Sequence, residues 1–131
     1  MTRTPPRPTE AELEILRVLW ERGPSTVRHV HEALATERDT GYTTTLKLMQ
    51  IMADKGLVTR DESSRTHIYT PRASQESTQR QLVNDLVDRA FGGSAAELVL
   101  RALSSHTTSD DELREIRKLI DEEREEREDR R

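Results

Sequence analysis

The sequence predicts a mainly α-helical protein: a winged helix-turn-helix of three helices plus a β-hairpin wing, then a C-terminal helical dimerisation domain. Three observations predict this fold. Apolar residues recur at helical spacing in three segments before Gly56, two short β-type runs then flank a polar turn, and further amphipathic segments follow Pro71. We therefore expect a disordered Pro-rich tail (1–8), a winged-helix domain (9–72) and a helical domain (73–131).

The first two helices are bounded by capping signals. Thr9 followed by Glu12 has the spacing of a capping box, so a helix is expected to start there and to end at Gly23-Pro24. Ser25 is expected to cap a second helix, which a polar loop from Glu37 to Gly41 follows. The residues expected to face the core from these two helices are Leu13, Ile15, Leu16, Leu19, Trp20, Val27, Val30 and Leu34.

The stretch GYTTTLKLMQIMADKGL predicts a third helix that opens on three threonines and ends at Gly56. A threonine costs roughly 0.5 kcal/mol per helical position relative to alanine, so its use at the start needs a reason. Hydroxyl groups there can cap free N–H groups, and the positive end of the helix dipole can face a phosphate. The alternative is that one threonine caps the helix and the others are only tolerated.

This third helix has two different sides on a helical wheel. The inner side is formed by Thr45, Met49 and Met52, with Leu48 and Ala53 beside them. The opposite side carries short polar groups and one cation, namely Thr43, Lys47, Gln50 and Asp54. Lysine and glutamine reach base edges in a major groove, so this side is expected to contact DNA. Ile51, nearer the polar side, either packs under the hairpin or contacts bases.

The hairpin is expected from two short β-type runs, at 57–60 and 66–71, around a polar turn. Its cations follow the third helix directly, which favours a DNA-contacting wing over the alternative of an ordinary solvated turn. The complete set of predicted DNA-binding residues is Tyr42, Thr43, Thr44, Thr45, Lys47, Gln50, Arg60, Arg65 and His67.

The C-terminal segment contains three helix starts, at Ser74, at Ser94 with Glu97 and at Ser109 with Glu112. These helices hold too few apolar residues for a core of their own, so we expect them to pair with a second copy of the chain. The charge run 121–131 is expected to be a solvated helix end. The predicted dimerisation residues are Leu82, Val83, Leu86, Val87, Phe91, Leu98, Leu113, Ile116 and Ile120.

The composition of the chain narrows the classes of function that are expected. The net charge is −4, but residues 1–72 carry net +1 and residues 38–72 carry net +2, so a mildly basic segment coexists with an acidic C-terminal half. The chain has no cysteine, no paired histidines at chelating spacing and no catalytic motif, so we predict no metal site, cofactor or enzymatic activity. No apolar run approaches the roughly 18 residues of a membrane span, so we expect no membrane insertion and a cytoplasmic location.

Five segments together resemble the BlaI/MecI penicillinase-repressor family, and the likeness extends from Pro8 to about Ile120. They are PTEAELEIL (8–16), Leu19-Trp20, Tyr42-Thr43-Thr44, Lys55-Gly56-Leu57-Val58 and His67-Ile68-Tyr69. The resemblance implies a homodimeric winged-helix repressor that binds palindromic operators. Members are often encoded with a membrane-bound sensor metalloprotease, whose signalling leads to repressor cleavage and release.

At two points the sequence departs from the family pattern, and these departures limit which family properties are expected of this chain. Arg101-Ala102 stands where the penicillinase and methicillin-resistance repressors have the Asn-Phe bond that is cut, so neither cleavage there nor a β-lactam response is inferred. The copper-responsive relatives carry a C-terminal cysteine motif that this chain lacks. Two functions therefore remain: a dimeric DNA-binding repressor that occludes its operator, or a winged-helix module that binds a partner protein.

Overall fold

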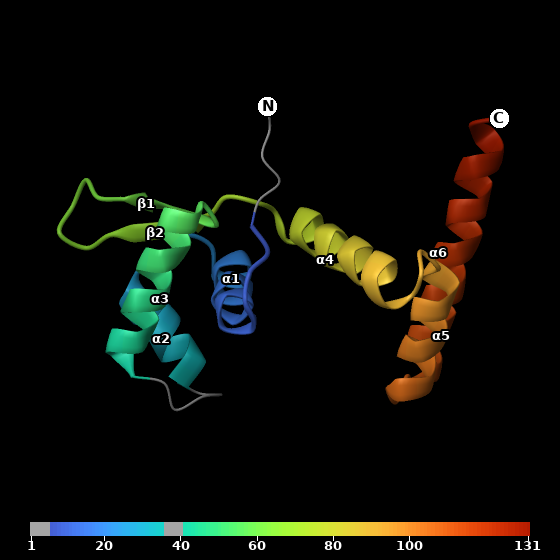
Figure 1. The fold of residues 1–131 in the computed structure, drawn as a ribbon, viewed down its shortest axis with the longest axis horizontal. Helices are drawn as coiled ribbons and strands as arrows, with labels where there is room; N and C mark the ends of the chain where they lie inside the picture. The colour runs from blue at the N-terminus through green and yellow to red at the C-terminus, as the bar shows by residue number, and fades with distance from the viewer. Residues whose placement is uncertain (1–5, 36–40) are drawn as a thin grey trace. The chain divides into compact units, whose positions relative to one another are not determined.

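The structure is a computed structural model that describes residues 6–35 and 41–131 (Figure 1). The chain divides into two compact units, residues 1–84 and 85–131, which are described separately. Residues 1–5 of the expected tail and 37–40 of the expected polar loop lie outside the described residues. The elements are α1 (Glu10–Arg22), α2 (Val27–Ala35), α3 (Tyr42–Lys55), β1 (Val58–Asp61), β2 (Ile68–Pro71), α4 (Gln75–Ala90), α5 (Ala95–Ser105) and α6 (Asp110–Asp129).

Unit 1 contains α1 to α3 and the hairpin, in the predicted winged-helix order (Figure 1). The strands pair antiparallel, with Arg60 opposite Tyr69. Tyr69 also bridges back to the turn before α2: its N–H donates to the Ser25 carbonyl at 2.9 Å, and the Ser25 N–H donates to the Tyr69 carbonyl at 3.1 Å. The hairpin is thereby fastened to the helices. The buried core consists of Ile15, Leu16, Leu19, Val27, Val30, Met49, Met52, Leu57, Val58 and Tyr69.

The start of α1 is the predicted capping box, whereas the start of α2 differs from the prediction. Thr9 accepts from the Glu12 N–H, and the Glu12 carboxylate accepts from the Thr9 N–H at 2.8 Å. The prediction that Ser25 caps α2 is wrong, because the backbone of Ser25 is paired with Tyr69 and its hydroxyl donates to the Gly23 carbonyl. Thr26 caps instead, accepting from the His29 N–H at 3.1 Å.

A buried ion pair connects α1 to the end of α3. Lys55 donates to both carboxylate oxygens of Glu12, at 2.8 and 3.0 Å, and Glu12 is only 2% exposed. Burial alone would raise the pKa of Glu12, but the hydrogen bonds from Lys55 and from the Thr9 backbone outweigh it, so this pKa lies below its ordinary value. One carboxylate thus caps α1 and anchors α3 at the same time.

The helices of unit 2 are capped as predicted but bury almost nothing. Ser94 accepts from the Glu97 N–H and Ser109 from the Glu112 N–H; α4, which begins in unit 1, starts likewise with Ser74 accepting from the Ser77 N–H. Neither α5 nor α6 has a buried residue, and none of the extensive packing contacts in the described chain involves α4, α5 or α6. Among the described residues, no helix is long and apolar enough to cross a membrane.

The buried ion pair leads to a prediction about stability. Glu12→Gln removes the charge that Lys55 and the Thr9 amide stabilise, and we expect it to lower the free energy of unfolding by about 1–3 kcal/mol at pH 7. Because the folded-state pKa of Glu12 is depressed, its contribution is present above about pH 4.5, the ordinary glutamate value, and is lost as pH falls further.

Urea unfolding of the wild type and the variant across pH measures this effect. The difference between them should shrink as the pH falls below 4.5. The control is Glu10→Gln, an exposed carboxylate in the same helical turn, which should change stability by less than about 0.5 kcal/mol. A Glu12→Gln variant as stable as the control would show that the ion pair contributes nothing.

Candidate nucleic-acid interface

The outward side of α3 carries most of the polar residues predicted to contact DNA. Thr43, Lys47 and Gln50 are all exposed, while Met49 and Met52 on the other side are completely buried. Ile51, for which the sequence analysis left two roles open, is 39% exposed, so part of its side chain faces solvent. The exposed side therefore presents an ammonium, an amide, hydroxyls, one aliphatic group and, near its C-terminal end, the carboxylate of Asp54. The ammonium, the amide and the hydroxyls suit the edges of base pairs.

The first turn of α3 differs from the prediction in two respects. Gly41 is the N-cap, and none of the side chains that the structure describes caps the helix, so the expectation that a hydroxyl of Thr43, Thr44 or Thr45 does so is wrong. Thr45 is also wrong as a DNA-contacting residue: it is only 1% exposed, and its hydroxyl reaches back to the Gly41 carbonyl at 3.5 Å. Thr43 and Thr44 stay exposed beside the helix N-terminus, whose positive end no side chain of the described residues caps.

A cation from α2 joins this end of α3, and the sequence analysis missed it. The guanidinium carbon of Arg28 lies 5.9 Å from the centroid of the Tyr42 ring, and the ring of His31 meets Tyr42 edge-on at 5.7 Å. His31 Nδ1 is buried without a hydrogen-bond partner among the described residues. Arg28 and His31 are three apart on α2 and so share a face, but their meeting with Tyr42 is a tertiary contact that spacing alone could not reveal.

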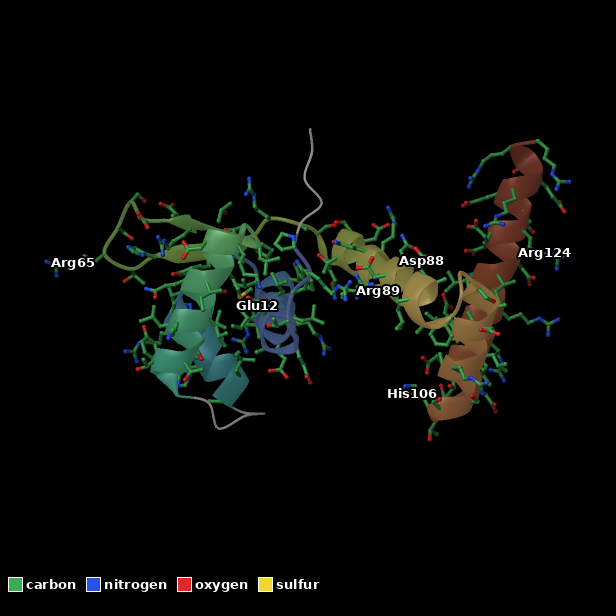
Figure 2. All side chains as sticks on the ribbon, in the orientation of Figure 1. Glu12, Arg65, Asp88, Arg89, His106 and Arg124 are labelled. Carbon is green, nitrogen blue, oxygen red and sulfur yellow. The ribbon has the colours of Figure 1, made fainter. Side chains whose placement is uncertain are left out.

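The three hairpin residues predicted to contact DNA differ in their contacts and exposure. Arg60 makes a side-chain hydrogen bond with Tyr69, which with the nearby Glu62 raises the pKa of Arg60, and it pairs with Glu62 at 2.6 Å. Arg60 is thus engaged within the hairpin. Arg65 lies at the tip and extends away from the body of unit 1 (Figure 2). His67 is half-buried at the base of the turn.

The turn of the hairpin has a defined shape. Asp61 accepts a hydrogen bond from the Ser63 N–H at 2.9 Å, and this bond lowers the pKa of Asp61 below its ordinary value. The Ser64 hydroxyl donates to the Thr66 carbonyl at 2.8 Å. These local bonds give the turn between the paired strands a defined shape, and Arg65 lies in this turn.

No chemistry beyond binding is visible at this surface. The described residues contain no group of three or more histidines or carboxylates placed to hold a metal ion. The face of α3 and the hairpin offers cations, an amide and hydroxyls, together with the exposed carboxylates of Asp54, Asp61 and Glu62. The cations, the amide and the hydroxyls suit contacts to a polyanion.

The family of the chain follows from a match that covers most of its length. The profile of the family described as penicillinase repressor matches residues 8–122. The chain belongs to the penicillinase repressor family. This confirms the predicted BlaI/MecI resemblance. The family consists of transcriptional repressors rather than enzymes, so the chain is a DNA-binding transcriptional regulator of the repressor type.

Individual repressors of the family support the assignment over different lengths. The transcriptional regulator BlaI of Mycobacterium tuberculosis is 34% identical over 92 residues, which are 70% of this chain and 67% of the relative. The penicillinase repressor of Bacillus licheniformis is 21% identical over 117 residues, covering 89% of this chain and 91% of the relative. The methicillin resistance regulatory protein MecI of Mammaliicoccus sciuri is 20% identical over 112 residues, covering 86% and 91%.

Two solved structures share the fold of unit 1. The DNA-binding domain of the repressor BlaI aligns with a TM-score of 0.50 at 22% identity, covering 56% of this chain and 90% of that domain. The monomeric form of Bacillus licheniformis BlaI in complex with the blaP half-operator aligns with a TM-score of 0.50 at 21% identity, covering 57% and 92%. The predicted winged-helix fold is confirmed.

Proposed function

We propose that this penicillinase repressor family member is a homodimeric repressor that binds a palindromic operator and occludes the promoter. The observation that carries the proposal is the two-sidedness of α3. Its buried methionines hold the helix rigidly, and its outward side exposes Thr43, Lys47 and Gln50. A helix held in this way can enter a major groove without rearrangement of its own fold.

In the proposed mode of binding, the outward side of α3 contacts bases, while the N-terminus of α3 and the wing contact phosphates. Lys47 and Gln50 would reach base edges, with Ile51 against a thymine methyl group. The backbone N–H groups at the N-terminus of α3 and the hydroxyls of Thr43 and Thr44 would donate hydrogen bonds to a backbone phosphate. Arg65 on the wing would contact the phosphates of a neighbouring groove.

Dimerisation is supported by the apolar residues that lie exposed on unit 2, which includes the end of α4. Leu86 is 49% exposed, and Leu100, Leu119 and Ile120 are exposed to a similar or greater extent. Single exposed leucines are ordinary, but this many on three successive helices without a shared core indicates a missing partner. Two copies would place two α3 helices in successive major grooves, roughly 34–36 Å apart for half-sites one turn apart.

The alternative, a winged-helix module that binds a partner protein, makes a different experimental prediction. Family membership favours the repressor, which also fits a cytoplasmic location. A gel shift with the promoter region upstream of the chain's own gene distinguishes the two functions. Saturable binding that survives excess competitor DNA supports the repressor, whereas binding that competitor abolishes supports the protein-interaction module.

Release by a membrane-bound sensor metalloprotease is part of the proposal only through the family resemblance. Arg101 and Ala102, which occupy the position of the bond cut in relatives, lie within α5 with exposed side chains. Their identity departs from the Asn-Phe pair, so a sensor acting on this chain would need a different specificity or a different bond.

A first prediction concerns Lys47. Lys47→Ala should weaken operator binding about tenfold, because one charge-assisted contact to a base or phosphate contributes about 1–3 kcal/mol. The wild-type affinity should also fall by at least about tenfold between 50 and 200 mM salt, since counterions are released on binding. Fluorescence anisotropy with labelled operator DNA measures both quantities. Lys118→Ala, an exposed lysine on α6, is the matched control. An affinity unchanged by salt would contradict phosphate-driven binding.

A second prediction tests Arg28 as a phosphate contact positioned by Tyr42. Arg28→Ala should weaken operator binding about three- to tenfold and reduce the salt dependence by about one phosphate contact per protomer. Tyr42→Ala should have a similar effect, and the double variant should be little worse than either single one, because both remove the same contact. Arg17→Ala, an exposed arginine on α1, serves as the control. Additive effects would show that Arg28 and Tyr42 act separately.

A third prediction locates the dimer interface. Leu86→Glu should convert the dimer to a monomer in analytical ultracentrifugation at micromolar concentration, because it places a charge among apolar residues that would be buried. Leu86 is half-exposed in the single chain, so circular dichroism should report unchanged helix content. Ile116→Glu should act in the same direction, and Asn84→Glu, off the apolar stripe of α4, should stay dimeric. If both Leu86→Glu and Ile116→Glu remained dimers, the interface would lie elsewhere.

A further inference from the structure

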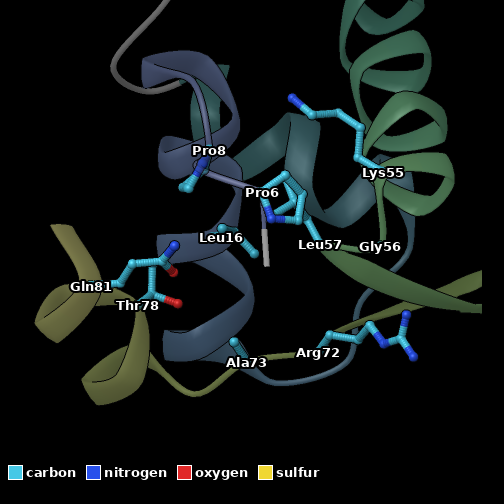
Figure 3. Close-up of a pocket in the computed structure, with 10 residues that line it drawn as sticks. All are labelled: Pro6, Pro8, Leu16, Lys55, Gly56, Leu57, Arg72, Ala73, Thr78 and Gln81. Carbon is cyan, nitrogen blue, oxygen red and sulfur yellow. The ribbon is translucent and has the colours of Figure 1, made fainter. Parts of the chain in front are cut away.

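Unit 1 contains a pocket at the end of α3 opposite its threonines. The pocket has a volume of about 710 Å³ and lies where the C-terminus of α3, the N-terminal segment before α1 and the start of α4 meet (Figure 3). Its apolar lining comes mainly from Pro6, Pro8, Leu16 and Leu57. This volume and lining are in the range of pockets that hold small organic molecules.

The charged side chains that line the pocket are cations. They are Lys55 and Arg72, and none of the described residues that line it is acidic. Lys55 is already paired with Glu12, whereas Arg72 is exposed and in no ion pair with the described residues. The guanidinium of Arg72 lies close to Gly56, where an added Cβ would sit 3.4 Å from Nη1. A cation held against backbone at the edge of an apolar pocket is a ready partner for a carboxylate.

The remaining polar groups complete an amphipathic site. Thr78 and Gln81 project from α4 on the side of the pocket away from Lys55 and Arg72 (Figure 3). They contribute a hydroxyl and an amide, polar groups that add no charge to the lining. The pocket therefore combines an apolar lining, neutral polar groups on one side and cations on the other.

We propose that this pocket binds a small organic anion, a carboxylate with an apolar body. The carboxylate pairs with Arg72, and the apolar body lies against the prolines and leucines. The charge of the lining disfavours a cationic ligand, because the guanidinium of Arg72 would repel it. The site lies at the opposite end of α3 from the proposed phosphate contacts, so occupancy requires no competition with DNA and the proposal does not depend on operator binding.

Trp20 provides a direct signal for binding. It is the single tryptophan of the chain, and its Nε1 donates to the carbonyl of Ala73, a residue that lines the pocket, at 3.1 Å. A ligand that enters the pocket changes the surroundings of this hydrogen bond. The intrinsic fluorescence of Trp20 and the NMR signal of its indole N–H should both respond.

The test uses three probes with the same eight-carbon chain: octanoate, octanol and octylammonium. Octanoate should give a saturable change in Trp20 fluorescence with a Kd on the order of 1 mM, as expected for a ligand of about ten heavy atoms. Octanol should bind several-fold more weakly, and octylammonium should not saturate. In proton–nitrogen correlation spectra, octanoate should shift the amide signals of Gly56 and Ala73 together with the indole of Trp20.

Variants of Arg72 separate recognition of the anion from apolar binding alone. Arg72→Gln should weaken octanoate about fivefold, Arg72→Lys should keep most of the affinity, and Arg124→Gln, an exposed control on α6, should change nothing. The proposal is overturned if octanoate fails to saturate the signal up to about ten times the expected Kd. It is also overturned if the three probes bind equally, if Arg72→Gln has no effect, or if the NMR shifts concentrate on α5 and α6.

Discussion

The burial of Met49 and Met52 is the packing on which the rest of unit 1 depends. Both side chains are fully buried in one core cluster with residues from α1, α2 and the hairpin, so α3 cannot rotate about its axis without exposing them. That constraint alone decides which residues of α3 face outward. The Glu12–Lys55 pair adds a second restraint at the C-terminal end of the helix, where a carboxylate that caps α1 also holds α3.

The same packing explains how the two units differ. The hydrophobic core of the described chain runs from Ile15 to Tyr69, and the 32% of hydrophobic residues cannot build a second core of equal quality. The helices of unit 2 consequently keep their leucines and isoleucines at the surface. Exposed apolar surface is unfavourable in water for a single chain, and a second copy of the chain would bury it. The composition of the C-terminal half is therefore consistent with the proposed dimer.

Much of the fold could be predicted because its signals are local. The capping residues Thr9, Ser74, Ser94 and Ser109 each act within three positions of themselves, and the two strands follow from short β-type runs. The failures have different causes. Ser25 does not cap α2 because its backbone pairs with Tyr69, a contact between distant parts of the chain. Thr45 faces inward because it lies on the methionine side of α3, a position that helical periodicity already indicated.

The sequence by itself determined the order of the elements, the polar character of the outward side of α3 and the family, since each of these is written in residue type and spacing. Only the tertiary structure decided that Glu12 pairs with Lys55, that Arg28 lies over Tyr42 and that Arg72 stands at the edge of an apolar pocket. The reason is physical. These contacts join residues 43 positions apart in the first case and two separate helices in the second, and the third is set by where an N-terminal segment meets α4. Distances of that kind depend on how the helices pack, which periodicity alone does not specify.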